Sequence, residues 1–180
     1  MTEFNGENVT LKDGLEVLIR PIQNDDGQKL VEMFNYLSEE TKYTRFMKFR
    51  KSIDEEELEP FLTADKKNFA IVAEIEPDDE DKESFIIADG RYVLDEPPDK
   101  ASVAIIVQDD YQRQGLATHM LSILIDIAKE NGIKYFHGEI LLENSKMLNF
   151  IKRTGYQYSY HDQKGVRYFN IDLEQIKTPL

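Results

Sequence analysis

The residues best suited to bind a ligand lie in the stretch QRQGLAT, residues 112–118, between a strand-like apolar run and a helix-like one. The first turn of a helix leaves backbone N–H groups without partners at the positive end of the helix dipole, and a phosphate group satisfies both. Gly115 lets an anion approach the backbone closely, and Ala117 keeps the same face small. Arg113 and the two glutamines beside it add donors. The stretch therefore predicts a phosphate site at the start of a helix.

Other chemical motifs are absent from the sequence. It contains neither the G-x-G-x-x-G dinucleotide fingerprint nor the G-x-x-x-x-G-K-[ST] phosphate loop. It has no cysteine, and its three histidines, His119, His137 and His161, lie far apart without the spacing of metal ligands. We therefore expect no metal site.

The charge of the chain indicates what it binds. A net charge of -13 repels phosphate backbones, so we expect no nucleic acid, and it attracts cationic partners such as a basic amine or a lysine-bearing protein. No apolar run approaches the ~20 residues that a membrane span needs, and the polar N-terminus is unlike a signal peptide. We expect a cytoplasmic protein without membrane contact, present as a monomer or homodimer.

The spacing of apolar residues predicts the elements that position the phosphate site. Asp13 and Gly14 predict a tight turn within a hairpin over residues 9–19, and Ser52 with Glu55 predicts a capping box opening a helix through Leu62. The other predicted helices span residues 24–37, 39–49, 115–130 and 144–153, and the other strands span residues 68–75, 84–94, 101–107, 135–141, 156–161 and 166–173.

This order of elements predicts one domain over residues 1–180, of the mixed α/β (α+β) class. Strands 101–107 and 135–141 are joined by a helix, and such a crossover is right-handed and makes the two strands parallel. We expect the rest of the sheet to be antiparallel, with helices flanking it.

The pattern Gln112-x-x-Gly115-x-Ala117 after an apolar strand resembles motif A of the GNAT superfamily, the Gcn5-related N-acetyltransferases. A helix that is led by Asn144 and ends before Gly155 also agrees with that family. The stretch NSKML, residues 144–148, is similar to the Pat-type protein lysine acetyltransferases. The resemblance covers residues 15–173 and implies a GNAT fold in which strands 101–107 and 135–141 splay apart, the first carrying a bulge.

The resemblance implies acetyl-coenzyme A as a co-substrate, with its pyrophosphate in the loop and its pantetheine arm between the splayed strands. A backbone N–H of Ile106 or Val107 would then stabilise the charge that develops on the thioester oxygen as an amine attacks. The implied cofactor-binding residues are Ile105, Ile106, Val107, Gln112, Arg113, Gln114, Gly115, Leu116, Ala117, Thr118, Asn144, Met147 and Phe150.

Two positions depart from the pattern of the family. Ser102 stands where Pat-type domains commonly have a glutamate that serves as the general base. Ile151 stands where many relatives have a tyrosine that protonates the departing thiolate. A thiol of pKa ~8.5 leaves without much protonation, but an amine of pKa near ~10 must lose a proton before it attacks.

Glu139 is the first candidate for the missing base. It alternates with the apolar Ile140 along its strand, which places it on the face away from the core. His137 lies on the same face and is the second candidate, while Glu39 and Glu40 are weaker ones.

Three functions remain open on this sequence. The first is an acetyl-CoA-dependent N-acetyltransferase that modifies a protein lysine by direct attack in a ternary complex. The second is the same chemistry on a small amine such as a polyamine. The third is an acyl-CoA-binding sensor with little catalysis, which Ser102 and Ile151 support.

Overall fold

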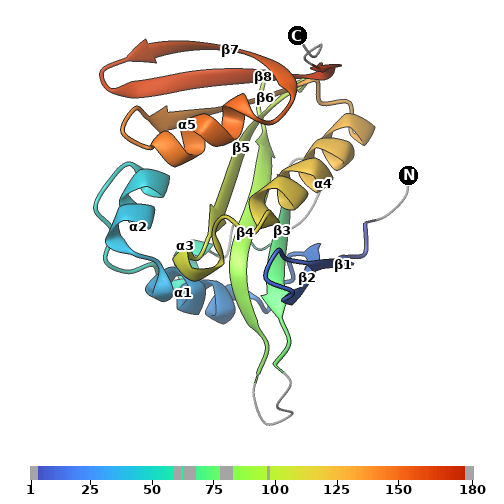
Figure 1. Cartoon of the computed structure of the whole chain (residues 1–180), viewed down its shortest axis with the longest axis vertical. Coiled ribbons are helices and arrows are strands. Elements are labelled where there is room, and N and C mark those ends of the chain that lie inside the picture. The colour runs from blue at the N-terminus through green and yellow to red at the C-terminus, as the bar shows by residue number, and fades with distance from the viewer. Residues whose placement is uncertain (1–3, 59–61, 63–67, 78–82, 97, 177–180) are drawn as a thin grey trace.

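The computed structural model describes residues 4–58, 62, 68–77, 83–96 and 98–176. In this part of the chain eight strands form one sheet in the order β1-β2-β3-β4-β5-β6-β8-β7 (Figure 1). The strands are β1 (Glu7–Thr10), β2 (Glu16–Pro21), β3 (Asn68–Ile75), β4 (Phe85–Leu94), β5 (Lys100–Val107), β6 (Tyr135–Leu141), β7 (Tyr156–Gln163) and β8 (Val166–Ile176). The helices are α1 (Gly27–Tyr36), α2 (Glu39–Phe46), α3 (Glu55–Leu58), the short 3-10 turn η2 (Asp109–Tyr111), α4 (Leu116–Glu130) and α5 (Ser145–Lys152).

The sheet is antiparallel except where β5 meets β6, so the predicted fold class is confirmed. The predicted first hairpin forms around Gly14, whose φ of 91° is a conformation that favours glycine. The crossover from β5 through α4 to β6 gives the parallel pair, as expected from the order of elements.

The parallel pairing of β5 with β6 is short, so the two strands separate beyond it and leave a gap in the sheet. β5 and β6 pair only from Lys100 opposite Tyr135 to Ser102 opposite His137. Beyond that point β6 stays paired with β8 as far as Leu141, and β5 stays paired with β4 through Val107. The predicted splay is therefore confirmed, while the predicted bulge in strand 101–107 is wrong, because its register with β4 is continuous.

Two apolar layers cover the two faces of the sheet. α4 and α5 lie on one face, in front of the strands in Figure 1, and their buried side chains share a cluster with Phe136 and Ile171. α1 and the inner residues of α2 and α3 lie on the other face, in a second cluster with Val72 and Ile106. Alternate residues of each strand therefore point to different layers.

Two helix predictions need correction. α2 ends at Phe46 rather than at residue 49, because Met47 adopts a left-handed conformation with φ of 54° and closes the helix. α3 begins at Glu55, so Ser52 does not cap it; Glu57 N instead donates to the Asp54 carbonyl at 3.0 Å. The part of this predicted helix over residues 59–61 lies outside the described residues.

Gly138 lies next to the point where β5 and β6 separate, and it has no room for a side chain. A Cβ there would lie 2.8 Å from the Phe169 ring and 3.3 Å from the Val103 carbonyl oxygen. We expect Gly138→Ala to lower the free energy of unfolding by about 1–3 kcal/mol, as overpacking does. Urea unfolding measures this. Phe169→Leu should recover part of the loss in the double variant, and an unchanged stability of Gly138→Ala would contradict the prediction.

Candidate functional site

The start of α4 presents a run of free backbone donors. In the part of the chain that the structure describes, the N–H groups of residues 113–117 have no hydrogen-bond acceptor, and no side chain caps the helix. Arg113 with φ of 64° and Gly115 with φ of 96° alternate with residues of negative φ and turn these N–H groups toward one side. A Cβ on Gly115 would meet nothing within 4 Å. The loop therefore has the donors and the open space that an anion needs.

The side chains of this loop divide into two groups. Gln112 donates its Nε2 to the Val107 carbonyl at 3.0 Å, so this glutamine ties the loop to the end of β5. Leu116 is buried in the core and Ala117 packs against it, whereas Arg113 and Thr118 are exposed. The loop is thus fixed at both ends, and among the described residues no anion pairs with Arg113.

The backbone of β5 has one paired and one open edge. Lys100 O accepts from Asp95 N at 2.9 Å on the β4 side, and Gln108 N also donates to β4, at 2.8 Å. Since the donors alternate along an antiparallel ladder, the even-numbered residues face β4, and Ile106 is among them. Val107 faces the other way, where pairing with β6 has ended. We therefore retain Val107 rather than Ile106 as the expected oxyanion donor.

Asp109 connects this loop to α2, a contact that sequence reasoning missed. Its carboxylate accepts from Ser38 N at 2.9 Å, from Ser38 Oγ at 2.8 Å and from Thr41 Oγ1 at 2.7 Å. Burial opposes ionisation of Asp109, but these hydrogen bonds outweigh it and lower its pKa below the usual value. The first turn of α2 is thereby held against the phosphate-binding loop.

The residues predicted to bind the cofactor from α5 have structural roles in that helix. Asn144 caps the helix, since its side chain accepts from Met147 N at 3.1 Å. Met147 and Phe150 are half-buried against the core layer of α4. Lys146 Nζ lies 3.8 Å from Glu40 Oε1, so α5 also contacts the first turn of α2. Glu39 and Glu40, the weaker base candidates, both belong to that turn.

Glu139 and His137 lie on the expected face. Their strand neighbours Phe136 and Ile140 are buried in the layer of α4, so both polar side chains point to the opposite layer. Glu139 is exposed, and β5 no longer pairs beside it. His137 is occupied by a hydrogen-bonded contact with Asp95. Of the two candidates, Glu139 is the one without a partner in the described residues.

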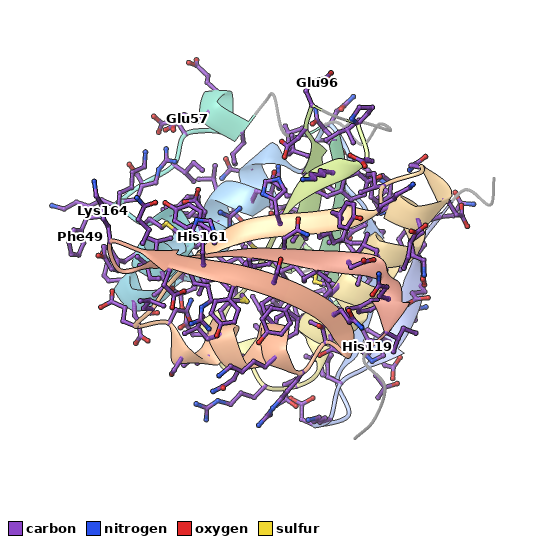
Figure 2. The ribbon with its side chains drawn as sticks, turned by 90° about the horizontal axis from the view of Figure 1, so that it is seen from above. Phe49, Glu57, Glu96, His119, His161 and Lys164 are labelled. Carbon is purple, nitrogen blue, oxygen red and sulfur yellow. The ribbon has the colours of Figure 1, made fainter. Side chains whose placement is uncertain are left out.

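A row of titratable side chains runs from Glu139 across the outer strands. Glu139 on β6 is opposite Tyr168 on β8, and Tyr168 is opposite His161 on β7. The rings of Tyr168 and His161 stack at 4.9 Å, and His161 is exposed on the hairpin (Figure 2). The row leads from the open edge of the sheet to solvent. Part of this row could have been predicted from the hairpin around Gly165, because its turn fixes which residues of β7 and β8 lie opposite each other.

The structure shows the surroundings of Ser102 and Ile151, the two positions that depart from the pattern of the family. Ser102 Oγ donates to the Val93 carbonyl at 3.4 Å and offers no base. Ile151 is buried in the core, so α5 supplies no proton donor at that position.

Over the described ranges, no cluster of three or more histidine, aspartate or glutamate residues is placed to hold a metal ion. Over the same ranges, no helix has the length and apolar character to cross a membrane.

These features define an acyltransferase of the GNAT class. The model of the acetyltransferase (GNAT) domain matches residues 16–157, and the chain therefore belongs to the GNAT acetyltransferase family. It is 29% identical over 148 residues to acetyltransferase PA5475 of Pseudomonas aeruginosa, covering 82% of this chain and 78% of that protein.

Proteins named Pat are also similar. The GNAT domain of S. lividans PAT matches with a TM-score of 0.81 and 29% identity, over 93% of this chain and 96% of that one. Acetyltransferase Pat of Mycolicibacterium smegmatis is 27% identical over 171 residues, which cover 94% of this chain and 50% of that protein. The chain thus spans half the length of this second Pat protein.

Proposed function

We propose that the chain transfers an acetyl group from acetyl-coenzyme A to a primary amine, and that the amine is the side chain of a protein lysine. The observation that carries the proposal is the run of free N–H groups over residues 113–117 beside the open edge of β5. The likeness to Pat proteins favours a lysine acceptor. Calorimetry with acetyl-CoA tests the proposal: we expect a micromolar dissociation constant, and no binding would overturn it.

Different residues of the site would bind different parts of acetyl-coenzyme A. The free N–H groups and Arg113 would hold the pyrophosphate, because donors at a helix start favour anions. The odd-numbered backbone groups of β5, at Ile105 and Val107, would pair with the amides of the pantetheine arm. Met147 and Phe150 on α5 would border the same arm.

The co-substrate would supply an activated acetyl group, and the protein would orient it and move one proton. The N–H of Val107, which faces away from β4, would donate to the thioester oxygen as negative charge develops there. The amine nitrogen bonds to the acetyl carbon, the carbon–sulfur bond breaks, and the thiolate leaves. The proton released from the nitrogen would pass to Glu139, which is itself exposed and can release it to solvent.

Replacing Glu139 tests the base. We expect Glu139→Gln to lower kcat about 100-fold near neutral pH, since positioned acid–base groups contribute roughly 10²–10⁴-fold. The Michaelis constant for acetyl-CoA should not change, because the carboxylate lies away from the phosphate loop. Thiol release with lysine peptides measures both, and Glu143→Gln, an exposed carboxylate two residues beyond β6, is the matched control. An undiminished kcat in Glu139→Gln would exclude Glu139 as the base.

Two other functions make different predictions in the same assays. A small-amine acetyltransferase releases thiol with polyamines rather than with lysine peptides. A sensor binds acetyl-CoA tightly and releases thiol at the background rate with every acceptor. Ser102 and the buried Ile151 support the sensor, because neither position supplies a proton carrier for acetyl transfer.

A further inference from the structure

We propose that the acceptor carries a carboxylate beside its amine, and that Arg45 on α2 binds this carboxylate. The inference rests on the proposed acetyl transfer and names the class of acceptor. It concerns the face of the sheet opposite α4, where Glu139 also points.

Arg45 is a half-buried cation, and among the described residues no carboxylate forms an ion pair with it. It lies in the last turn of α2, and its guanidinium carbon is 5.2 Å from the Phe46 ring, which packs against the inner layer. Among the described residues no carboxylate or carbonyl accepts a hydrogen bond from it. Burial lowers its pKa, and the nearby Asp89 charge only partly offsets this. A guanidinium removed from water in this way is stabilised by an incoming anion.

Asp89, the carboxylate whose charge acts on Arg45, already pairs with Arg91. Asp89 is buried and accepts two hydrogen bonds from Arg91, Nε at 3.0 Å and Nη2 at 2.6 Å. Both charges of this pair act on the pKa of Arg45: the negative charge of Asp89 raises it, and the positive charge of Arg91 lowers it. Among the described residues Asp89 is thus paired with Arg91, and no hydrogen bond joins it to Arg45.

Space for an acceptor lies beside these groups. Ala104 is opposite Arg91 on the neighbouring strand, and Ser102 follows on the same face. Both lie in an interior strand and yet remain partly exposed. An acceptor lying over Ser102 and Ala104 would extend from the side of α2 toward the open edge of β5 at Val107 and toward Glu139 on β6.

The sequence around Arg45 supports an anionic group on the acceptor. Residues 41–51, TKYTRFMKFRK, contain Lys or Arg at five positions and no Asp or Glu, in a chain of net charge -13. Phe49 in this segment is 84% exposed and lies at the edge of the molecule in Figure 2. A basic segment on an acidic protein steers anionic groups to this side.

The carboxylate has two possible sources, and matched acceptors distinguish them. One is an Asp or Glu side chain next to the lysine of a protein, and the other is the carboxylate of a small amino acid. The first arm compares lysine peptides flanked by Glu with the same peptides flanked by Gln. The second compares free lysine with lysine amide. In the wild type we expect the acid member of one arm to have a Michaelis constant about 10- to 100-fold lower than its neutral analogue, as for a charge-assisted hydrogen bond.

The variant Arg45→Gln should abolish this preference, so that the acid acceptor and its neutral analogue have the same Michaelis constant. Arg45→Lys should retain part of it, because a lysine keeps the charge and loses the planar pair of donors. Lys12→Gln, an exposed cation in the turn between β1 and β2, removes the same charge from the other side of the molecule and should change nothing. Equal preference for acid and neutral acceptors in the wild type, or a preference that survives Arg45→Gln, would overturn the inference.

Calorimetry with acetyl-CoA separates this result from the proposed function. If wild type and Arg45→Gln both bind acetyl-CoA and acetylate neutral amines, acetyl transfer stands and only the carboxylate site is in question. If neither binds acetyl-CoA, the proposed function fails first. Circular dichroism of Arg45→Gln confirms that α2 remains folded, so loss of structure is not mistaken for loss of recognition.

Discussion

Gly115→Asp should abolish acetyl-CoA binding while the protein stays folded. The substitution puts a carboxylate into open space at the start of α4, where a Cβ would meet nothing within 4 Å, so packing is not disturbed. The new charge would compete for the free N–H groups of residues 113–117 and repel a pyrophosphate. We expect the affinity to fall about 100-fold or more, measured by calorimetry, as the loss of several charge-assisted hydrogen bonds implies.

A second glycine of the same helix provides the control. Gly132 follows the end of α4 with φ of 82°, close to the 96° of Gly115, and a Cβ there would also meet nothing within 4 Å. Gly132→Asp therefore carries a similar backbone strain, of roughly 1–2 kcal/mol, without approaching the loop. It should lose some stability and keep its affinity. Equal affinities of the two variants would contradict a phosphate site at α4.

The phosphate-binding loop could be predicted from sequence because everything it needs is local. A strand, a glycine of positive φ and a helix start follow one another within a few residues, and the free N–H groups are a property of any helix start. The tight turn at Gly14 and the end of α4 before Gly132 were predictable for the same reason. In each case the residue type and the backbone conformation belong to the same position.

The acceptor side could not be predicted in this way, because its contacts join distant parts of the chain. In the sequence Arg45 looks like an ordinary helix residue, and only the fold brings it under the influence of the Asp89 charge on β4. Asp109 looks like a loop residue until Ser38 approaches it. The prediction that Ser52 caps a helix was wrong for a related reason. A capping pattern shows only that a helix could begin at that residue, and α3 begins later, at Glu55.

The row from Glu139 to His161 is an intermediate case. The alternation of each strand predicts its face, and the turn at Gly165 predicts that Tyr168 lies opposite His161. What the sequence lacks is the order of the sheet, in which β8 rather than β7 pairs with β6. That order is set by long-range packing, and it decides that Tyr168 is the neighbour of Glu139.

The largest expected loss of stability belongs to Glu74, which holds two cations in the buried end of the sheet. Glu74 accepts from Arg20 Nε at 2.7 Å and from Lys29 Nζ at 2.6 Å, and Arg20 continues to Asp26 at the start of α1. Burial alone would raise the pKa of Glu74, but the hydrogen bonds from Arg20, Lys29 and Ser84 outweigh it and lower the pKa from 4.5 to about 2. The carboxylate is thus bound more tightly to the fold than its protonated form.

We therefore expect Glu74→Gln to lower the free energy of unfolding by about 3 kcal/mol near neutral pH. Since the folded pKa lies below the ordinary value of 4.5, this contribution is complete above that pH and is lost as the pH falls toward 2. The gap between wild type and variant should shrink to less than half by about pH 3. Urea unfolding at several pH values measures it, with the exposed Glu76→Gln as the control, which should stay within about 0.5 kcal/mol of wild type. A gap that does not narrow in acid would mean that Glu74 stabilises the fold by its shape and not by its charge.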